Sequence, residues 1–268
     1  MSTASLPMYD FPEVRGATDA WWAGLARHLE HEGVTEVPAA LLRRDDLIEQ
    51  WSDPKLLISQ TCGYLLAGQC RTVLQPVATP HYTAPGCSGS NYASVILVRD
   101  SHPATELEDL RGGVAVYSRT YSHAGYNALR GIVAPLSGGK PFFSAVLGSG
   151  SHVDSIRLVA AGTGDIATVC CIIYAFVARW RPRALAGTRI LGYTPLAPAP
   201  PFVAPIGASR QRIAQLRAAL AAAMADPALA PVRDDLHLGG ISVLGRASYD
   251  GIAAVEQAAL AMGYADLA

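Results

Sequence analysis

Residues 114–130 read VAVYSRTYSHAGYNALR, and this stretch decides the fold. Its first four residues are an apolar run that predicts a strand over Val114–Tyr117. From Gly125 onward, apolar side chains recur at the spacing of one helix face: Tyr126, Leu129 and Val133. A strand that leads through a polar turn into a helix is the repeating unit of α/β folds. The stretch therefore predicts such a fold, with a candidate ligand site where the helix begins.

The same alternation of strand and helix continues on both sides of this stretch. Short apolar runs predict further strands at residues 5–9, 56–60, 73–79, 94–99, 143–147, 166–171 and 188–193. Helical spacing predicts a helix that begins near residue 18 and stops at residue 33. Two further helices are expected to follow residues 148–151 and residue 171. The C-terminal part of the chain predicts helices at 209–224, 227–235 and 248–262. Because strands alternate with helices, we expect parallel sheets with both faces covered.

The composition excludes several classes of protein. Half of the 268 residues are hydrophobic and 16% are charged, so the chain supplies a sizeable core and is not disordered. The formal net charge of -1 gives no basic field that would attract nucleic acid. No run of about 18 apolar residues exists, so we expect no membrane insertion.

The N-terminus and the cysteines both bear on the cellular compartment. The first ten residues lack the basic and apolar regions of a signal peptide, which predicts a cytoplasmic protein as the sequence stands. If a leader had been removed, the location would be periplasmic or extracellular. The odd number and scattered spacing of the cysteines favour free thiols over a disulfide framework. They are Cys62, Cys70, Cys87, Cys170 and Cys171. Cys87 lies in an expected loop, and we assign it no role.

Four places satisfy the rule that ligands of α/β folds lie beyond the carboxyl ends of strands. They are the turn after Tyr9 and the runs 59–63, 122–127 and 148–152. Each is an expected strand end followed by a turn, or by small and hydroxyl residues that open a helix.

Five strings in these regions carry a resemblance to a known family. They are SLPMYD (5–10), SQTCGY (59–64), ATPHYTAPGC (78–87), SHAGYNALR (122–130) and GSHVDSI (150–156). In this order they resemble the phosphate/phosphite/phosphonate-type substrate-binding proteins of ABC transporters, over residues 5 to about 180. The resemblance implies a type II periplasmic-binding-protein fold, with two α/β lobes, two crossover hinge strands and a ligand cleft between the lobes. We place lobe one at residues 1–92 plus 194–268 and lobe two at 93–193.

The resemblance also implies the ligand-binding residues. In this family, hydroxyls and backbone amides at a helix N-terminus hold a tetrahedral anion, which suits the dipole and free N–H groups there. The matching run is 122–125, while the family's pocket histidine corresponds to His152 and its pocket aspartate to Cys170. The expected ligand-binding residues are Tyr9, Gln60, Thr61, Tyr92, Ser122, His123, Gly125, Tyr126, Ser151, His152 and Cys170, with Tyr82 as the alternative to Tyr92 near the hinge.

Two departures from the family pattern predict an altered pocket. His123 and Ala124 stand where the family tends to have Thr or Ser, and Cys170 stands in place of the carboxylate. Because buried polar groups left unpaired cost about 1–3 kcal/mol each, we expect a different ligand that is still small and partly anionic. We expect no cofactor and no resident metal, although the two histidines and a cysteine leave a metal site as an alternative.

Three hypotheses of function follow. The favoured one is a binding protein without chemistry, whose partners are a small-molecule ligand and, if it is exported, an ABC permease. The second is a cytoplasmic, thiol-dependent enzyme in which His123 or His152 activates Cys170. The competing interpretation of Cys170 is a small apolar side chain that fills a strand end. The third is a cytoplasmic ligand sensor that signals by closure of its lobes.

Overall fold

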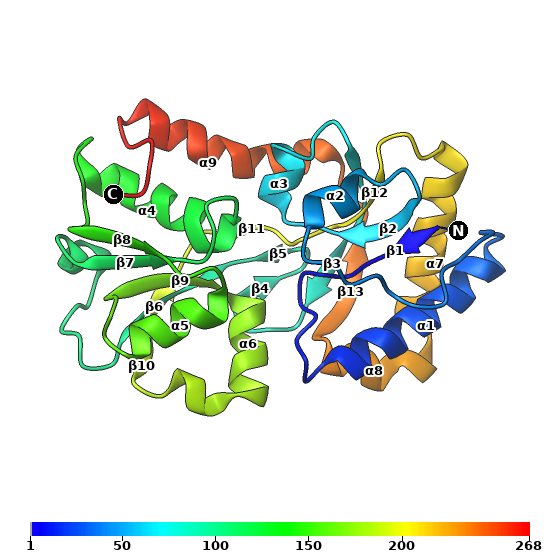
Figure 1. The fold of residues 1–268 in the computed structure, drawn as a ribbon, viewed down its shortest axis with the longest axis horizontal. Coiled ribbons are helices and arrows are strands. Elements are labelled where there is room, and N and C mark those ends of the chain that lie inside the picture. The colour runs from blue at the N-terminus through cyan, green and yellow to red at the C-terminus, as the bar shows by residue number, and fades with distance from the viewer. Residues whose placement is uncertain (1) are drawn as a thin grey trace. The chain divides into compact units, whose positions relative to one another are not determined.

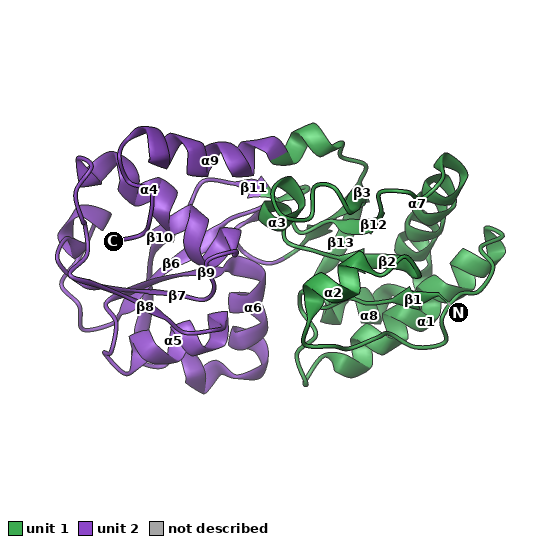
Figure 2. Ribbon diagram, turned by 45° about the horizontal axis from the view of Figure 1, so that its top comes forward, with its two compact units in different colours: residues 1–83, 88–91, 198–249 green, residues 84–87, 92–197, 250–268 purple. Residues whose placement is uncertain are grey.

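The computed structural model describes residues 2–268, and the chain divides into two compact units (Figure 2). Unit 1 contains the chain up to Thr83, Ser88–Asn91 and Pro198–Tyr249. Unit 2 contains Ala84–Cys87, Tyr92–Ala197 and Asp250–Ala268. The chain therefore passes from one unit to the other five times, and each unit is built from segments far apart in the sequence.

Unit 1 is built on a five-stranded sheet in the order β1-β2-β12-β3-β13 (Figure 1). Its strands are β1 (Thr3–Ala4), β2 (Leu56–Gln60), β3 (Leu74–Tyr82), β12 (Phe202–Pro205) and β13 (Leu238–Ser242). β1 and β2 are parallel, whereas β12 is antiparallel to both β2 and β3. β2 and β3 thus run in the same direction with an antiparallel strand between them.

The helices of unit 1 pack around this sheet. They are α1 (Arg15–His31), α2 (Leu47–Ser52), α3 (Gly63–Ala67), α7 (Arg210–Ala225) and α8 (Ala230–Asp235), with 3-10 turns at Pro227–Leu229 and Arg246–Tyr249. Trp21, Trp22 and Leu25 of α1 are fully buried. A Cβ on Gly24 of α1 would lie 2.5 Å from the Leu229 side chain, so glycine permits close packing here.

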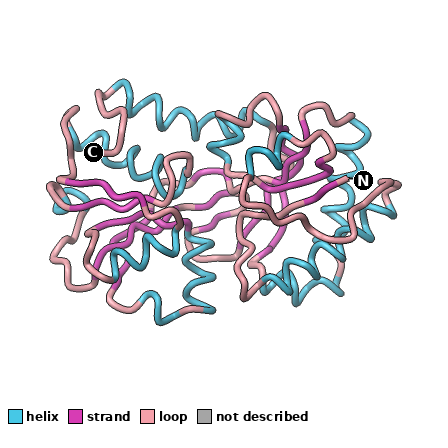
Figure 3. Tube along the Cα trace, viewed as in Figure 1, coloured by secondary structure: helices cyan, strands magenta, loops and turns pink. Residues whose placement is uncertain are grey.

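Unit 2 is built on a second five-stranded sheet in the order β10-β6-β9-β7-β8. Its strands are β6 (Ser94–Arg99), β7 (Val114–Tyr117), β8 (Ala145–Gly148), β9 (Ile166–Cys170) and β10 (Thr188–Tyr193). β7, β8 and β9 are parallel to one another, whereas β6 is antiparallel to β9 and to β10. The three parallel strands are therefore neighbours at one side of the sheet. Figure 3 shows the strands of the chain in magenta and its helices in cyan.

The helices of unit 2 lie on both faces of its sheet. They are η2, a π-helical turn at His123–Asn127, α4 (Ala128–Ser137), α5 (His152–Ala160), α6 (Cys171–Trp180) and α9 (Asp250–Ala261), with 3-10 turns at Leu107–Leu110 and Pro182–Leu185. Figure 1 shows α4 and α9 on one face and α5 and α6 on the other. Among residues 2–268, no helix has the length and apolar character needed to cross a bilayer.

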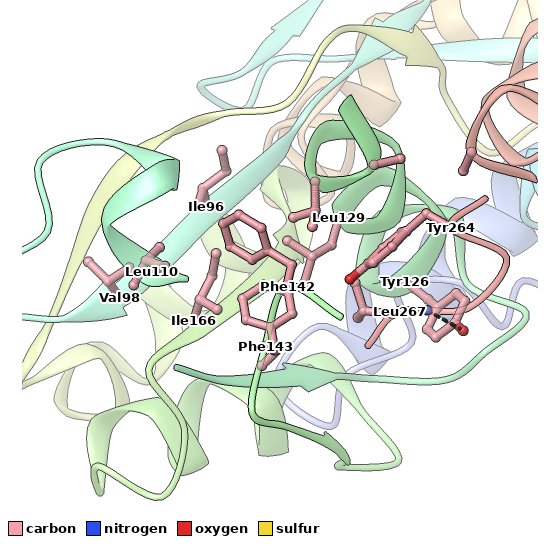
Figure 4. Packing of buried hydrophobic residues seen from close by; sticks show 14 of the residues in the cluster. Ile96, Val98, Leu110, Tyr126, Leu129, Phe142, Phe143, Ile166, Tyr264 and Leu267 are labelled. Carbon is pink, nitrogen blue, oxygen red and sulfur yellow. Dashed lines mark hydrogen bonds between the residues drawn. The ribbon is translucent and has the colours of Figure 1, made fainter. Parts of the chain in front are cut away.

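The main hydrophobic core of unit 2 includes the C-terminal segment of the chain (Figure 4). Ala259, Tyr264 and Leu267 pack with Phe142 and other apolar residues of the sheet and of α4. The backbone N–H of Phe142 donates to the carbonyl of Ala268, which fixes the chain end to this unit. Residues 250–268 therefore belong to unit 2, whereas the sequence analysis placed them in lobe one. Their apolar spacing predicts a helix but not the surface that the helix covers.

A third, three-stranded sheet lies where the chain passes between the units. Its order is β11-β5-β4, with β11 (Ala197–Pro198), β5 (Asn91–Tyr92) and β4 (Cys87–Ser88). No signal in the sequence distinguished these two-residue strands from turns.

Several strands have the bounds that the sequence predicts, and others differ. The predictions at 56–60, 94–99, 114–117 and 188–193 agree with the structure. The run 5–9 is a turn instead, and the strand precedes it at Thr3–Ala4. The expectation of parallel sheets is only partly right, because β6, β10, β12 and β13 pair in antiparallel register.

The core position of the C-terminal segment predicts the effect of two matched substitutions. Leu267 is 5% exposed and packs in the core of unit 2, whereas Leu260, on α9, is 51% exposed. Leu267→Ala should lower the free energy of unfolding by about 2–4 kcal/mol, and Leu260→Ala should change it by less than about 0.5 kcal/mol. Thermal and denaturant unfolding measure both. Equal effects of the two variants would contradict the assignment of this segment to unit 2.

Candidate functional site

The carboxyl ends of three parallel strands meet at one edge of the sheet in unit 2. Tyr117, the last residue of β7, pairs with Gly148, the last residue of β8. β9 ends nearby at Cys170, which pairs with Ser94 at the start of antiparallel β6. The segments that follow β7, β8 and β9 lead into η2, α5 and α6. This edge therefore brings three helix N-termini together, as the rule for α/β ligand sites requires.

The helix that follows β7 begins with a π-helical turn. Ser122 caps it, because the Gly125 backbone N–H donates to Ser122 Oγ at 3.1 Å and the Asn127 N–H donates to the Ser122 carbonyl at 3.1 Å. η2 continues directly into α4, so the combined helix runs from His123 to Ser137. The first N–H groups of such a helix have no partner within it and carry a positive partial charge, which favours an anion.

Gly125 packs closely against residues that follow β7 and β8. A Cβ on Gly125 would lie 2.1 Å from Ser118 Oγ and 3.0 Å from His152 Cε1. Only glycine leaves the space that these two side chains occupy. Ser118 follows β7 directly, and His152 is the first residue of α5. The structure therefore brings Gly125 and His152 together, as the sequence predicts, and adds Ser118.

Three polar atoms of this region make no hydrogen bond within residues 2–268. They are Ser118 Oγ, His152 Nδ1 and Thr168 Oγ1. Ser118 and Thr168 are buried, and buried hydroxyls are nearly always paired in proteins unless a ligand or water completes them. Neither residue is among those that the sequence predicts. The position of Ser118 directly after a strand was a usable signal, but nothing distinguished Thr168 from a core residue of β9.

A chain of hydrogen bonds fixes which nitrogen of His123 carries a proton. Arg130 Nη2 donates to Asn127 Oδ1 at 2.7 Å, so the amide nitrogen of Asn127 faces the other way. That nitrogen donates to the Ile252 carbonyl at 2.9 Å and lies 3.2 Å from His123 Nδ1. Nδ1 must then accept, and the neutral ring carries its proton on Nε2. His123 therefore has a fixed Nε2–H donor.

Burial keeps both histidines of this region neutral. Loss of solvation lowers the pKa of His123 to about 4 and that of His152 to about 4. A hydrogen bond with the Thr168 backbone partly opposes the shift at His152. Because Nδ1 of His152 has no partner, this bond uses Nε2 as donor and leaves Nδ1 with a lone pair that can accept a hydrogen bond from a ligand.

Other predicted residues of unit 2 make contacts within the fold itself. Ser151 caps α5, with its Oγ accepting from the Asp154 N–H at 3.0 Å. Tyr126 packs in the hydrophobic core, and its hydroxyl accepts from the Leu267 N–H at 3.2 Å. Tyr92 meets the His123 ring edge to face, with centroids 6.3 Å apart. Cys170 is buried and is the residue that precedes α6.

The predicted residues of unit 1 form a separate group. Gln60 Nε2 donates to the Tyr82 hydroxyl at 2.8 Å and to the Pro200 carbonyl at 3.0 Å. Tyr82 and Tyr9 pack edge to face, with centroids 5.2 Å apart. Thr61 is fully buried, and its Oγ1 makes no hydrogen bond within residues 2–268. Ser59 is also buried, but it accepts from Trp51 Nε1 at 3.0 Å, so Thr61 stands out as incomplete.

In the part of the chain that the structure describes, no three His, Cys, Asp or Glu side chains lie together in an arrangement that could hold a metal ion. The metal alternative for His123 and His152 therefore has no cluster of this kind to support it.

Comparison with known proteins identifies the family. The family model for the periplasmic phosphonate substrate-binding proteins of ABC transporters matches residues 20–257. A search of curated proteins found no significant match.

Solved structures show the same fold at low sequence identity. A binding protein component of an ABC phosphonate transporter from Pseudomonas aeruginosa is 15% identical, with a TM-score of 0.76 over 97% of this chain and 87% of that chain. PhnD1 from Prochlorococcus marinus in complex with methylphosphonate is 13% identical, with a TM-score of 0.74 over 96% and 97% of the two chains. A Xanthomonas citri protein bound to ATP is 15% identical, with a TM-score of 0.72 over 97% and 98%. The predicted two-lobed periplasmic-binding-protein fold is thereby confirmed.

The contact at Gly125 predicts a specific destabilisation. Gly125→Ala forces a methyl group into Ser118 Oγ and His152 Cε1, which should cost about 1–3 kcal/mol of unfolding free energy. Gly16→Ala is the control, because a Cβ there meets nothing within 4 Å in helix α1. It should be neutral or stabilising by up to about 1 kcal/mol. Denaturant unfolding compares the two, and an unaffected Gly125→Ala protein would show that the turn is not held against these side chains.

The lowered pKa of His123 predicts how stability depends on pH. The unfolded chain takes up its proton near the ordinary pKa of about 6.5, whereas the folded ring does so only near about 4. The unfolded state therefore binds more protons between these values, and stability should fall as pH drops through this window, by up to about 1.4 kcal/mol per pH unit. His123→Gln should reduce the slope, and His31→Gln, at an exposed histidine, should not. A slope that His123→Gln leaves intact would contradict the assignment.

Proposed function

Because this chain belongs to the family of periplasmic phosphonate substrate-binding proteins of ABC transporters, we propose that it binds a small oxyanion at the helix N-terminus formed by residues 122–125. One observation carries the proposal. Ser118 Oγ and the His152 ring, through its Cε1, both lie at Gly125 in the first turn of this helix. Neither Ser118 Oγ nor His152 Nδ1, which is bonded to Cε1, has a hydrogen-bond partner within residues 2–268.

The groups at this site specify the kind of anion. Ser118 Oγ, the Nε2–H of His123 and the backbone N–H groups of the turn are donors, while His152 Nδ1 is an acceptor. Donors suit the charged oxygens of an anion, and the acceptor suits an oxygen that still carries its proton. A singly protonated phosphonate or phosphate has both kinds of oxygen. We therefore favour a monoprotonated oxyanion of this class as the ligand.

The departures from the family pattern adjust the pocket and do not remove it. His123 supplies an N–H where the family tends to have a hydroxyl, so a donor is retained at that position with a longer reach. Cys170 stands in place of the family's carboxylate, which removes the natural partner of an amino group on the ligand. The pocket should therefore discriminate against aminoalkyl phosphonates and in favour of ligands without a cationic group.

We further propose that Tyr9, Gln60 and Thr61 of unit 1 complete the ligand shell. The support is the unpaired, fully buried Oγ1 of Thr61, which directly follows Gln60 at the end of β2. Gln60 bonds to Tyr82, and Tyr82 packs against Tyr9. The family membership supports a periplasmic location and an ABC permease as the partner that receives the ligand. We also propose that the two hinge crossings lie between residues 92 and 93 and between residues 193 and 194.

The enzyme alternative requires a thiolate at Cys170 with an imidazolium from His123 or His152 beside it. Burial that lowers the pKa of both rings to about 4 opposes this ion pair at neutral pH. Binding without chemistry is therefore the function that we propose.

A binding assay with matched variants tests the proposal. Isothermal titration of the purified chain with methylphosphonate, phosphate, phosphite, aminoethylphosphonate and small carboxylates should find at least one phosphorus oxyanion that binds. Ser118→Ala should weaken that binding by about 10-fold or more, since a hydrogen bond to a charged group contributes about 1.5–3 kcal/mol. Thr61→Val tests unit 1 in the same way, and Ser144→Ala, at an exposed serine of unit 2, is the control.

The outcomes separate the hypotheses. No binding by any phosphorus oxyanion, or full affinity in Ser118→Ala, would overturn the proposed site. Conversion of a bound ligand that is lost in Cys170→Ser while binding persists would favour the enzyme alternative instead.

A further inference from the structure

Two cysteine side chains of unit 2 lie in contact although they are far apart in the sequence. Cys87 Sγ is 3.4 Å from Cys171 Sγ, and the two residues are 84 positions apart in the sequence. Cys87 begins β4, and Cys171 is the first residue of α6. Cys171 is buried, and Cys87 is partly exposed.

The backbone on both sides of this thiol pair is held by hydrogen bonds. The Cys171 N–H donates to the Ala93 carbonyl at 3.2 Å, and the Ala93 N–H donates to the Gly86 carbonyl at 2.9 Å. The Cys87 N–H donates to the Ala84 carbonyl at 3.0 Å. Ala93 thus connects the segment that carries Cys87 to the start of α6. These main-chain bonds hold the segment that carries Cys87 beside the start of α6, so the two thiols lie within reach of each other.

Gly86 shows how closely the two segments pack. Its φ of 93° lies in the left-handed region that favours glycine. A Cβ at this position would lie 3.0 Å from Cys171 Cβ and 2.9 Å from the Tyr193 ring. A side chain at residue 86 would therefore push the loop away from α6 and separate the thiols.

We propose that Cys87 and Cys171 form a disulfide bond. A disulfide needs sulfur atoms about 2.05 Å apart, so the present 3.4 Å must close by about 1.4 Å, which small side-chain rotations achieve. This proposal goes beyond ligand binding and differs from the sequence-based expectation of five free thiols. It agrees with the periplasmic location of the family, because that compartment is oxidising.

The reaction is thiol–disulfide exchange with an external disulfide as oxidant. The thiolate of the more accessible Cys87 attacks one sulfur of the oxidant and releases the first thiolate, which leaves a mixed disulfide on Cys87. The Cys171 thiolate then attacks the Cys87 sulfur and releases the second. The two cysteine protons end on the two released thiols, so two cysteines are oxidised and one disulfide is reduced.

The bond would fix a segment that lies between two parts of unit 1 in the sequence. Residues 84–87 belong to unit 2, whereas the chain before Ala84 and the segment that begins at Ser88 belong to unit 1. A covalent link from Cys87 to α6 would hold this crossing segment on unit 2. The link closes a long loop, and disulfides that close long loops restrict the unfolded chain most.

Mass spectrometry of the full-length protein tests the proposal. The purified chain is incubated with excess glutathione disulfide, denatured and alkylated. We expect three alkylated cysteines in place of five, and recovery of all five after reduction. Digestion without reductant should yield a linked pair of peptides that contain residues 87 and 171. The oxidised protein should unfold at a Tm about 5 °C or more above that of the reduced protein.

Variants identify the sulfur atoms, because Cys170 and Cys171 fall on one peptide. Cys87→Ser and Cys171→Ser should leave every remaining thiol alkylated and abolish the rise in Tm. Cys170→Ser is the matched control and should still form the bond. Should Cys171→Ser fail to fold, Cys87→Ser at the more exposed position gives the same answer. Five alkylated thiols after oxidation, a bond that needs Cys170, or one that joins Cys62 to Cys70 would overturn the proposal.

Discussion

The guanidinium of Arg130 is only 4% exposed, and a charged group so far from water must be satisfied by its neighbours. Its hydrogen bonds reach Asn127 in the first turns of the same helix and the Ala265 carbonyl near the chain end, and it pairs with Glu256 of α9 at 3.2 Å. These partners come from parts of the chain that are more than a hundred residues apart. Removing any one of them would leave a buried charge incompletely paired, which is far more costly than losing an exposed ion pair. The C-terminal segment and the combined helix His123–Ser137 are therefore held as one body.

The sequence allowed much of the fold to be predicted, because the decisive strands are continuous apolar runs such as Val114–Tyr117. The strands that escaped prediction have other compositions. β12 follows the proline-rich stretch that ends at Pro201, and β13 contains two consecutive glycines, Gly239 and Gly240, so neither shows a strand pattern. The unit to which the C-terminal helix belongs could not be predicted either. Its helical period is visible in the sequence, but its assignment to unit 2 depends on the partners of Arg130, which no local pattern reveals.

The candidate site was predictable to a similar degree. Motif order placed Ser122, Gly125 and His152 at the ends of parallel strands, and the structure brings all three to one edge. Motif order could not show that Ser118 contacts Gly125. That contact depends on how closely the backbone after β7 approaches the helix, which no motif records. Nor could motif order distinguish Ser151, whose hydroxyl is used to cap α5, from a hydroxyl that is left for a ligand. Which polar atoms remain unpaired is decided only by the assembled structure.

The π-helical turn at His123–Asn127 affects how a deletion in the sequence would alter the proposed site. A turn closed by bonds to the fifth preceding residue holds one residue more than an α-helical turn. Deleting a single residue there would restore the α-helical pattern and rotate the residues before it by about 100° around the axis, without moving the helix that follows. The core face of α4 and its contacts with α9 would keep their register, while a different set of side chains would face the strand ends. At the proposed site, the loss of one codon would therefore exchange the side chains that face a ligand, while the packing of the rest of unit 2 would stay as it is.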